Sequence, residues 1–575
     1  MRIAYLIGLL LIVVVTGRRR RSFRDPATFN ANQNYHMNAV IPNATEFFFE
    51  VPLDHFAYAS TNVFKIRCEL NLDHYVDGGP IFFYPGNEGT ITGFMTATGI
   101  MWDLAANFNA AVLFAEHRYY GASSPFGKEN DYKNVATMAY LTSEQALADY
   151  AQLLISLKGG NTAAKHSIAR IKLCFFGGSY GGMLAAWFRM KYPHLAVGAW
   201  ASSAPLKYFN EGGVDWGAFD DVTTRTFIDS GASYNNVKNG WTALRNLAKT
   251  TDGQKFLNDL FNVTDNSTIK DSASGENLVG YVREAIEYMA MVDYPYETNF
   301  LEPMPGFPVK VASQFLKDEG NWTDKELAIM LFKASNIYYN YYNDSSYQAC
   351  LDPEKCGDPG TSELGDPLGW PWQECTEIVI EQCARNSSFF FDECTDRPLE
   401  LLYQMCNDTF GKLGWTRPLM RYNAVRDLYG LDISAYSNII LTQGHLDPWS
   451  VGGYKAGDPG VNGQNGIYVV EIPGSAHHLD LRTPNTCDGN PTHNLRFQAV
   501  NIIKCWLTEG CVNPVLKDLP PLNDVTTVKC EDMINKYPWG QSDNGPSGDK
   551  GSSTAKFMLA MAFMAFVQRF LITKS

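Results

Sequence analysis

Gly177-Gly178-Ser179-Tyr180-Gly181 lies between two segments of different character. The apolar run Ile171–Phe176 comes before it and predicts a buried strand, and Met183–Lys191 comes after it and predicts a helix that ends before Pro193. A serine in a glycine-rich turn between strand and helix is typical of a nucleophile elbow, in which the sharp turn exposes the hydroxyl at the carboxyl edge of a sheet. The stretch therefore predicts Ser179 as a nucleophile. A structural turn with an incidental serine is the alternative.

Short apolar runs and a helical pattern alternate on both sides of this stretch. The runs predict strands at Gly79–Tyr84, Ala110–Ala115, Asn438–Leu441 and Ile467–Ile472, and Ser143–Leu157 predicts a helix. Alternating strands and helices favour a mostly parallel sheet with helices on both faces. Together with the serine turn, this pattern predicts an α/β-hydrolase fold.

Acidic and basic partners for the serine follow later in the chain. A serine hydroxyl needs a neighbouring base to take its proton, and α/β-hydrolases place the acid and the histidine after later strands, in the order Ser, Asp, His. Asp447 follows the strand predicted to end at Leu441, and His477 and His478 follow the strand predicted to end at Ile472. Neighbouring residues of an extended loop point to opposite sides, so only one of the two histidines can be the base.

Both ends of the chain carry targeting patterns. Residues 1–17 contain Arg2, an apolar run and small residues at the cleavage position, as in a signal peptide. Arg18–Arg21 follow directly, and positive charge there also fits an uncleaved signal-anchor. Near the other end, small residues precede the apolar run Phe557–Val567, which resembles a lipid-anchor signal and is short for a membrane-spanning helix. A plain buried or disordered terminus is the alternative.

Changes in pattern divide the chain into six segments. The part after Leu206 is helical in pattern and rich in sequons and cysteines. It interrupts the alternation of strands and helices, and the strand pattern returns near Asn438. We interpret this part as an inserted, disulfide-bearing helical cap. The predicted segments are a signal peptide (1–17), an N-terminal or pro-segment (18–46), the first part of the core (47–206), the cap (207–430), the second part of the core (431–535), and a polar spacer with an apolar tail (536–575).

Sequons and cysteines indicate the secretory route. Twelve cysteines occur, none with Cys-x-x-Cys zinc spacing, which predicts disulfides formed in an oxidising compartment. Cys174 lies in a predicted strand and is expected to be a buried free thiol, so at least one more cysteine is unpaired or pairs between chains. The predicted N-glycosylation sites are Asn43, Asn262, Asn266, Asn321, Asn343, Asn386 and Asn407.

Composition excludes several classes of protein. The 575 residues are 45% hydrophobic, which is enough for a large core and too apolar for a disordered chain. Lys and Arg number 47 and Asp and Glu 61, giving a net charge of −14. No basic patch of nucleic-acid-binding type occurs in the body of the chain, so no nucleic-acid partner is expected. No cofactor and no metal ion are expected either.

Longer blocks of sequence surround the predicted catalytic residues. They are Gly86–Gly89, Glu116–Gly121, Leu141–Leu147, Gly177–Trp187, Ala290–Tyr296, Asp447–Trp449 and Ala476–Arg482. From about residue 47 to 506 the chain resembles the serine exopeptidase family of lysosomal Pro-X carboxypeptidase and dipeptidyl peptidase II. The resemblance implies an α/β-hydrolase core with a helical cap, and cleavage of peptides after proline. Gln443 departs from the family's Asn, and Cys356 and Cys394 are additional cysteines, which leaves the cap disulfides open.

The resemblance also implies roles for individual residues. It assigns the nucleophile to Ser179, the base to His477 and the orienting acid to Asp447. The oxyanion hole is expected to use the backbone N–H groups of Tyr180 and Asn87. Trp449 is a candidate for stacking on a substrate proline, with packing in the core as the alternative.

The expected function is that of a proline-directed serine exopeptidase. We expect release of a C-terminal residue through an acyl-enzyme on Ser179, with release of an N-terminal dipeptide as the alternative. A non-catalytic adhesion or binding module is a second alternative, although all three triad residues are present. A lipase or esterase is disfavoured because the chain lacks a His-Gly-Gly-Gly loop. Expected partners are peptides with proline near a terminus, in the lysosome or outside the cell. Attachment to a membrane through the tail and a homodimer are left open.

Overall fold

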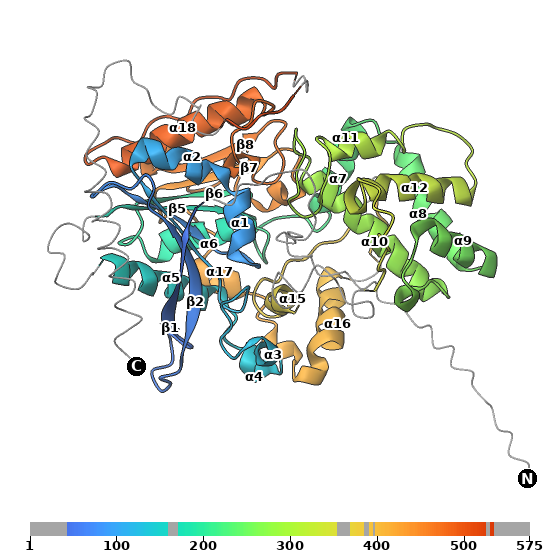
Figure 1. The fold of residues 1–575 in the computed structure, drawn as a ribbon, viewed down its shortest axis with the longest axis horizontal. Coiled ribbons are helices and arrows are strands. Elements are labelled where there is room, and N and C mark those ends of the chain that lie inside the picture. Colours follow the sequence, from blue (N-terminus) through green and yellow to red (C-terminus); the bar gives the residue numbers. More distant parts are fainter. Residues whose placement is uncertain are drawn as a thin grey trace, which may run out of the picture.

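A single mixed sheet forms the centre of the computed structural model, which describes residues 43–158, 171–352, 368–384, 390–394, 397–524 and 529–533. Its eight strands lie in the order β1-β2-β4-β3-β5-β6-β7-β8 (Figure 1). The first two strands run antiparallel to their neighbours, and the others are parallel. The strands are β1 (Thr45–Pro52), β2 (Val63–Asn71), β3 (Ile81–Pro85), β4 (Ala111–Ala115), β5 (Leu173–Gly178), β6 (Gly198–Ser202), β7 (Ile439–Gly444) and β8 (Ile467–Ile472).

Helices cover both faces of the sheet (Figure 1). Successive side chains of a strand point to opposite faces, so Phe83 and Phe175 pack against one pair of helices while Phe82 and Phe176 pack against the other. Strands buried on both faces are apolar throughout, as the short runs of the sequence predicted. The α/β-hydrolase fold is thereby confirmed. The helices are α5 (Ser143–Lys158) and α6 (Ser179–Lys191) on the first face, and α2 (Gly99–Phe108) and α18 (Asn490–Leu507) on the second.

The predicted strands are all present, but the start of α6 differs from the prediction. This helix begins at Ser179 and not at Met183. Gly181 and Gly182 lie in its first turn, and glycine costs about 1 kcal/mol relative to alanine inside a helix, which is why the sequence pattern placed the start too late. A Cβ would meet the side chain of Asn87 at Gly181 and the carbonyl oxygens of Ser202 and Gly177 at Gly182, which favours glycine at both positions.

A group of helices lies beside the sheet in the chain between β6 and β7, and we call this group the cap helices (Figure 1). Val425 and Tyr429, near the end of this part of the chain, pack instead in the core that α5 and α6 form with the sheet. The helices between Ala218 and Tyr339 enclose a hydrophobic core of their own, to which Trp449, Ala476 and Leu479 also belong. These three residues come from the loops that follow β7 and β8, so the cap core continues directly onto those loops. The cap helices are α7 (Ala218–Asp229), α8 (Tyr234–Ala248), α9 (Thr251–Phe261), α10 (Ser272–Met291), α11 (Pro308–Ser313), α12 (Asp324–Tyr339), α15 (Gly369–Glu374), α16 (Pro398–Phe410) and α17 (Ala424–Tyr429).

Disulfides join cysteines in the cap and in the C-terminal part of the core, as expected for an oxidising compartment. In the described part of the chain, Cys68 and Cys174 are buried free thiols, which confirms the expectation for Cys174 and identifies a second unpaired cysteine. The described disulfides are Cys375–Cys406, Cys383–Cys394, Cys487–Cys530 and Cys505–Cys511.

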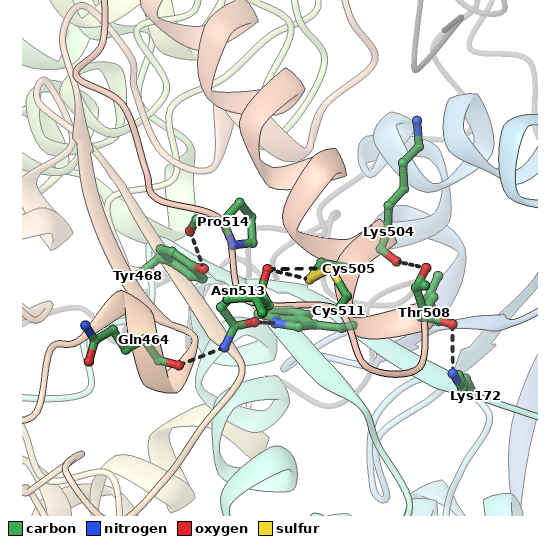
Figure 2. Close-up of a disulfide and its surroundings, with 12 residues drawn as sticks. Lys172, Gln464, Tyr468, Lys504, Cys505, Thr508, Cys511, Asn513 and Pro514 are labelled. Carbon is green, nitrogen blue, oxygen red and sulfur yellow. Dashed lines mark hydrogen bonds between the residues drawn. A yellow bond between two sulfur atoms is a disulfide. The ribbon is translucent and has the colours of Figure 1, made fainter. Parts of the chain in front are cut away.

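The last of these disulfides fastens the end of α18 to the segment that follows it. Figure 2 shows Cys505 and Cys511 bonded beside Asn513, whose side-chain amide donates to the carbonyl of Gln464 at 3.1 Å. The hydroxyl of Tyr468 on β8 donates to the carbonyl of Pro514 at 2.7 Å. Covalent and polar contacts therefore hold this segment against the edge of the sheet.

Several predictions concern residues near or beyond the ends of the described ranges. The signal peptide (1–17), most of the segment 18–46, the whole tail (536–575) and Asn386 lie outside the described residues. The other six sequon asparagines are exposed, so glycosylation at them stays a prediction that their position permits. Within the described ranges, no helix is long and apolar enough to cross a membrane.

We expect replacement of Arg118 by methionine to destabilise the fold by about 3–5 kcal/mol. Arg118 is fully buried after β4, and its guanidinium donates to both carboxylate oxygens of Asp149 on α5, each at 2.7 Å, and to the carbonyl of Leu53 at 2.8 Å. Without the guanidinium, the carboxylate of Asp149 stays buried and loses its main partner. Urea denaturation followed by circular dichroism measures the free energy of unfolding.

An exposed ion pair provides the control for this measurement. Arg417 pairs with Glu400, and both side chains are about half exposed. Exposed pairs contribute about 0–1 kcal/mol to stability. Arg417→Met should therefore lower the free energy of unfolding by no more than about 1 kcal/mol. Equal losses in the two variants would contradict the structural role assigned to Arg118.

Candidate active site

Ser179 lies at the turn between β5 and α6 with a φ of 57°, in the left-handed region that non-glycine residues rarely adopt. Its neighbours make this turn possible. A Cβ added to Gly177 would lie 2.1 Å from the carbonyl oxygen of Gly181, and one added to Gly181 would lie 2.1 Å from the amide oxygen of Asn87. The turn is therefore a strained elbow that leaves the serine half-buried at the carboxyl end of β5.

Asp447 and His477 form a buried pair next to this elbow. Asp447 follows β7, and one of its carboxylate oxygens accepts the backbone N–H of Trp449 at 3.0 Å. The other oxygen lies 2.7 Å from Nδ1 of His477, and both side chains are fully buried. An ionised carboxylate only accepts hydrogen bonds, so this contact requires a proton on Nδ1 of His477. Among the described residues, Nε2 has no hydrogen-bond partner.

The cap holds the backbone of His477 from one side. Its N–H donates to the carbonyl of Met291 at the end of α10 at 2.9 Å, and its carbonyl accepts the hydroxyl of Tyr294 at 2.9 Å. These contacts join residues that are far apart in the sequence. The position of the imidazole therefore depends on the cap as well as on the sheet.

The sheet and α18 hold the same loop from the other side. The carboxylate of Asp480 accepts the indole N–H of Trp200 at 3.0 Å and the hydroxyl of Ser202 at 2.6 Å, both from β6. The guanidinium of Arg496 on α18 donates to the carbonyl of Asp480 at 2.8 Å. Strand β6 and helix α18 thus fix the loop that carries the two histidines from this side.

His478 lies beside His477, with the ring centres 4.5 Å apart, and its φ of 39° is left-handed, so the expectation of an extended loop with the two rings on opposite sides is wrong. Its backbone N–H donates to the hydroxyl of Ser203 at 2.8 Å, and its ring packs edge-on against Phe300 and close over Gly178. Burial, and then the neighbouring His477, lower the pKa of His478 well below its usual range, so this ring is neutral. Of the two histidines, only His477 is hydrogen-bonded to the acid.

Asn87 and Tyr180 are both fixed beside the elbow. The side-chain amide of Asn87 donates to the carbonyl of Gly178 at 2.8 Å. The hydroxyl of Tyr180 lies 3.1 Å from Nε2 of His117 and accepts the amide of Gln373, from α15 of the cap, at 2.8 Å. Tyr180 lies in the first turn of α6, where backbone N–H groups have no partner within the helix. Its N–H is therefore available to a negatively charged oxygen at the elbow.

A pocket opens at Ser179 between the sheet and the cap. Trp449 contributes to its wall and also packs edge-on against Phe219 of α7, with the ring centres 5.1 Å apart. The wall is mostly apolar, and Glu88 is the one carboxyl among its described residues. The pocket is lined by Glu88, Ser179, Tyr180, Met183, Pro205, Met291, Trp370, Ile380 and Trp449.

Glu88 and Glu116, two of the glutamates in the resembling blocks, differ in their surroundings. Glu116 accepts the backbone N–H groups of Ile91 at 3.1 Å and Ala122 at 2.8 Å, together with the hydroxyl of Ser123 at 2.7 Å. It is a structural carboxylate that ties two loops together. Burial raises the pKa of Glu88 to about 7, and its Oε2 has no hydrogen-bond partner among the described residues.

Comparison with known proteins identifies the family. The model of the serine carboxypeptidase S28 family matches residues 51–497. The chain belongs to the S28 family. As an S28 member it is a serine peptidase with peptide substrates, which argues against a non-catalytic module.

Curated relatives of this S28 chain match over nearly their whole length. It is 49% identical to "Putative serine protease pcp-1" of Caenorhabditis elegans over 547 residues, or 94% of this chain and 96% of that protein. It is 39% identical to "Prolyl carboxy peptidase like protein 5" of the same organism, over 88% and 98% of the two chains. It is also 39% identical to human "Lysosomal Pro-X carboxypeptidase", over 82% and 90%.

The fold of this S28 peptidase brings together the residues singled out in the sequence. Ser179, Asp447 and His477 follow β5, β7 and β8 at the carboxyl edge of the sheet, and Asp447 and His477 are hydrogen-bonded to each other. Tyr180 and Trp449 line the pocket at Ser179, and Asn87 is bonded to Gly178 next to it. The supporting residues Tyr294, Asp480 and Arg496 were not assigned roles beforehand. Tyr294 and Asp480 lie inside the resembling blocks, which was a usable signal, but nothing in the sequence pointed to Arg496.

Proposed function

We propose that this S28 chain is a serine exopeptidase that cleaves peptides after proline and releases the C-terminal residue. The observation that carries the proposal is the buried Asp447–His477 pair, in which Nε2 of His477 has no hydrogen-bond partner among the described residues, together with the strained serine elbow at the same edge of the sheet. A neutral imidazole held in this tautomer is the base that a serine nucleophile requires.

The proposed reaction proceeds in two stages. His477 takes the proton of Ser179 as its oxygen attacks the carbonyl carbon of the scissile bond, and the backbone N–H groups of Tyr180 and Asn87 stabilise the oxyanion. The intermediate collapses to an acyl-enzyme when His477 gives the proton to the leaving amine. Water, activated by the same imidazole, then releases the acyl part and restores the serine.

Preference for proline is supported by the shape and chemistry of the pocket. The described wall is largely apolar, and Trp449 offers an aromatic face next to Asp447, on which a pyrrolidine ring packs well. Release of a C-terminal residue is supported by the names of the relatives, two of which denote prolyl or Pro-X carboxypeptidases.

Two blocked peptides test the direction of cleavage. A peptide with an acetylated amino end and proline next to last should be cleaved, whereas a peptide with proline second and an amidated carboxyl end should not. Cleavage of the second peptide alone would replace the proposal with dipeptide release. Turnover of neither peptide by folded enzyme, together with no fluorophosphonate adduct on Ser179, would refute a serine exopeptidase.

A lysosomal or extracellular site of action is also proposed. The disulfides, the exposed sequons and the name of the human relative support the secretory route. Attachment through the tail rests on the sequence of 536–575 alone, and release from cell membranes by a phosphatidylinositol-specific phospholipase tests it. Protein that is already soluble before the treatment would end that part of the proposal.

We expect Tyr294→Phe to lower kcat about threefold to tenfold while KM stays nearly constant. The variant loses one hydrogen bond, of about 0.5–1.5 kcal/mol, to the carbonyl of His477 and so loosens the base without touching the pocket wall. Tyr339→Phe is the matched control, because its hydroxyl also donates to a buried carbonyl, that of Tyr281 at 3.0 Å. Steady-state kinetics should separate the two variants, and an equal fall in kcat would contradict a positioning role.

A further inference from the structure

Two polar atoms in the wall of the Ser179 pocket have no hydrogen-bond partner in the part of the chain that the structure describes. Oε2 of Glu88 and the indole N–H of Trp370 are buried, and neither makes a hydrogen bond with any described residue. An unpaired buried polar group costs about 1–3 kcal/mol, and such groups are rare in folded proteins. One of these atoms is an acceptor and the other a donor, and both line the space beside the nucleophile.

Both side chains are held in place. Glu88 is only 4% exposed and follows Asn87, whose amide is fixed to the carbonyl of Gly178. Trp370 packs edge-on against the ring of Tyr180, with the ring centres 5.3 Å apart. Trp370 belongs to α15, which Gln373 ties to the hydroxyl of Tyr180. The core therefore presents the acceptor and the cap presents the donor.

A peptide backbone carries the complementary pair of groups. Each residue except proline has one N–H donor and one carbonyl acceptor. In a substrate cleaved after proline, the proline offers no N–H, so the nearest complete pair on that side of the scissile bond belongs to the residue before the proline. An apolar pocket with a few placed polar groups is the usual design of a site that fixes the orientation of its ligand.

We propose that Glu88 accepts the N–H, and Trp370 donates to the carbonyl, of the residue that precedes the substrate proline. This inference rests on the proposed function and adds two substrate-binding residues to it. The N–H has two sources, the amide of an extended peptide or the terminal amine of a substrate with proline second. In both cases the carboxyl of Glu88 meets a nitrogen-bound hydrogen at the same place.

Binding to a protein that cannot turn over separates this inference from the reaction. In the Ser179→Ala background, calorimetry compares the product acetyl-Ala-Pro with its analogue methylated on the alanine nitrogen, which lacks the N–H. We expect methylation to weaken binding about tenfold when Glu88 is present, and less than twofold in the Glu88→Met variant. Glu88→Gln keeps an acceptor oxygen and should keep the sensitivity. The same methylation penalty with Glu88 and with methionine would overturn the proposal.

Further binding measurements identify which nitrogen of the substrate supplies the N–H, and they test Trp370 as the donor. If Ala-Pro with a free amine binds more than tenfold more tightly than acetyl-Ala-Pro, and only when Glu88 is present, the source is the terminal amine. Trp370→Phe should weaken binding of acetyl-Ala-Pro about fivefold, while Trp322→Phe, whose indole donates to Asp318 elsewhere in the cap, should not change it. Equal effects of the two tryptophan variants would remove Trp370 from the proposal. Failure of the exopeptidase itself is visible separately, as wild-type enzyme that cleaves neither blocked peptide.

Discussion

Replacing Ser179 with alanine is expected to lower kcat by a factor on the order of 10⁶, because triad residues act as a unit and removal of the nucleophile removes the covalent route. The fold should be unaffected. Alanine keeps the Cβ, so the strained φ of 57° at this position is neither relieved nor increased. Hydrolysis of a proline-containing peptide measures kcat, and circular dichroism with thermal melting checks the fold.

A serine away from the pocket serves as the control. Ser434 is exposed in the loop before β7, and Ser434→Ala should leave turnover unchanged. A fluorophosphonate probe should label wild type and Ser434→Ala but not Ser179→Ala. Turnover of Ser179→Ala within tenfold of wild type would refute the assignment of the nucleophile.

The second large effect on kcat is expected from replacing His477, and it distinguishes this histidine from its neighbour His478. His477→Ala should lower kcat about 10⁴-fold or more, because the serine then loses its base and Asp447 loses the group that it orients. His478→Ala should cost far less in kcat and act partly through stability, since it empties the space over Gly178 beside Phe300.

Measurement of kcat for both variants at matched fractions of folded protein decides which histidine is the base. Thermal melting gives those fractions, and the His478 variant is expected to melt at the lower temperature. A greater loss of kcat in His478→Ala than in His477→Ala would reverse the assignment of the base. Equal losses would show that both rings take part in the proton transfer.

Much of the fold could be predicted because its signals are local. The buried strands are short apolar runs, and the elbow is a serine among glycines between a strand and a helix. Strand β6 was missed because Gly198–Ser202 consists mostly of small residues and has no apolar run. β1 and β2 were missed as well, because their exposed and buried residues alternate only in part. The order Ser, Asp, His then predicted which later residues would meet at the sheet edge.

The supports of the site could not be predicted in the same way. The hydroxyl of Tyr294 binds the carbonyl of His477 across 183 residues of sequence, and Ser202 binds Asp480 across 278. Contacts of this kind depend on how the cap and the sheet are arranged, and no local pattern records that arrangement. The same holds for the unpartnered atoms of Glu88 and Trp370, which become visible only when the pocket wall is assembled.

The insertion of the cap between β6 and β7 also sets the order in which a growing chain can become active. The indole of Trp200 on β6 binds Thr442 on β7 across 242 residues, so the strand that leads to Asp447 joins the sheet only after the whole cap has been synthesised. At 5–20 residues per second, the 278 residues from Ser202 to Asp480 take about 15–55 s to translate. With the proposed triad, the nascent chain during that interval carries Ser179 without its base, so we expect no peptidase activity until the second part of the core has folded.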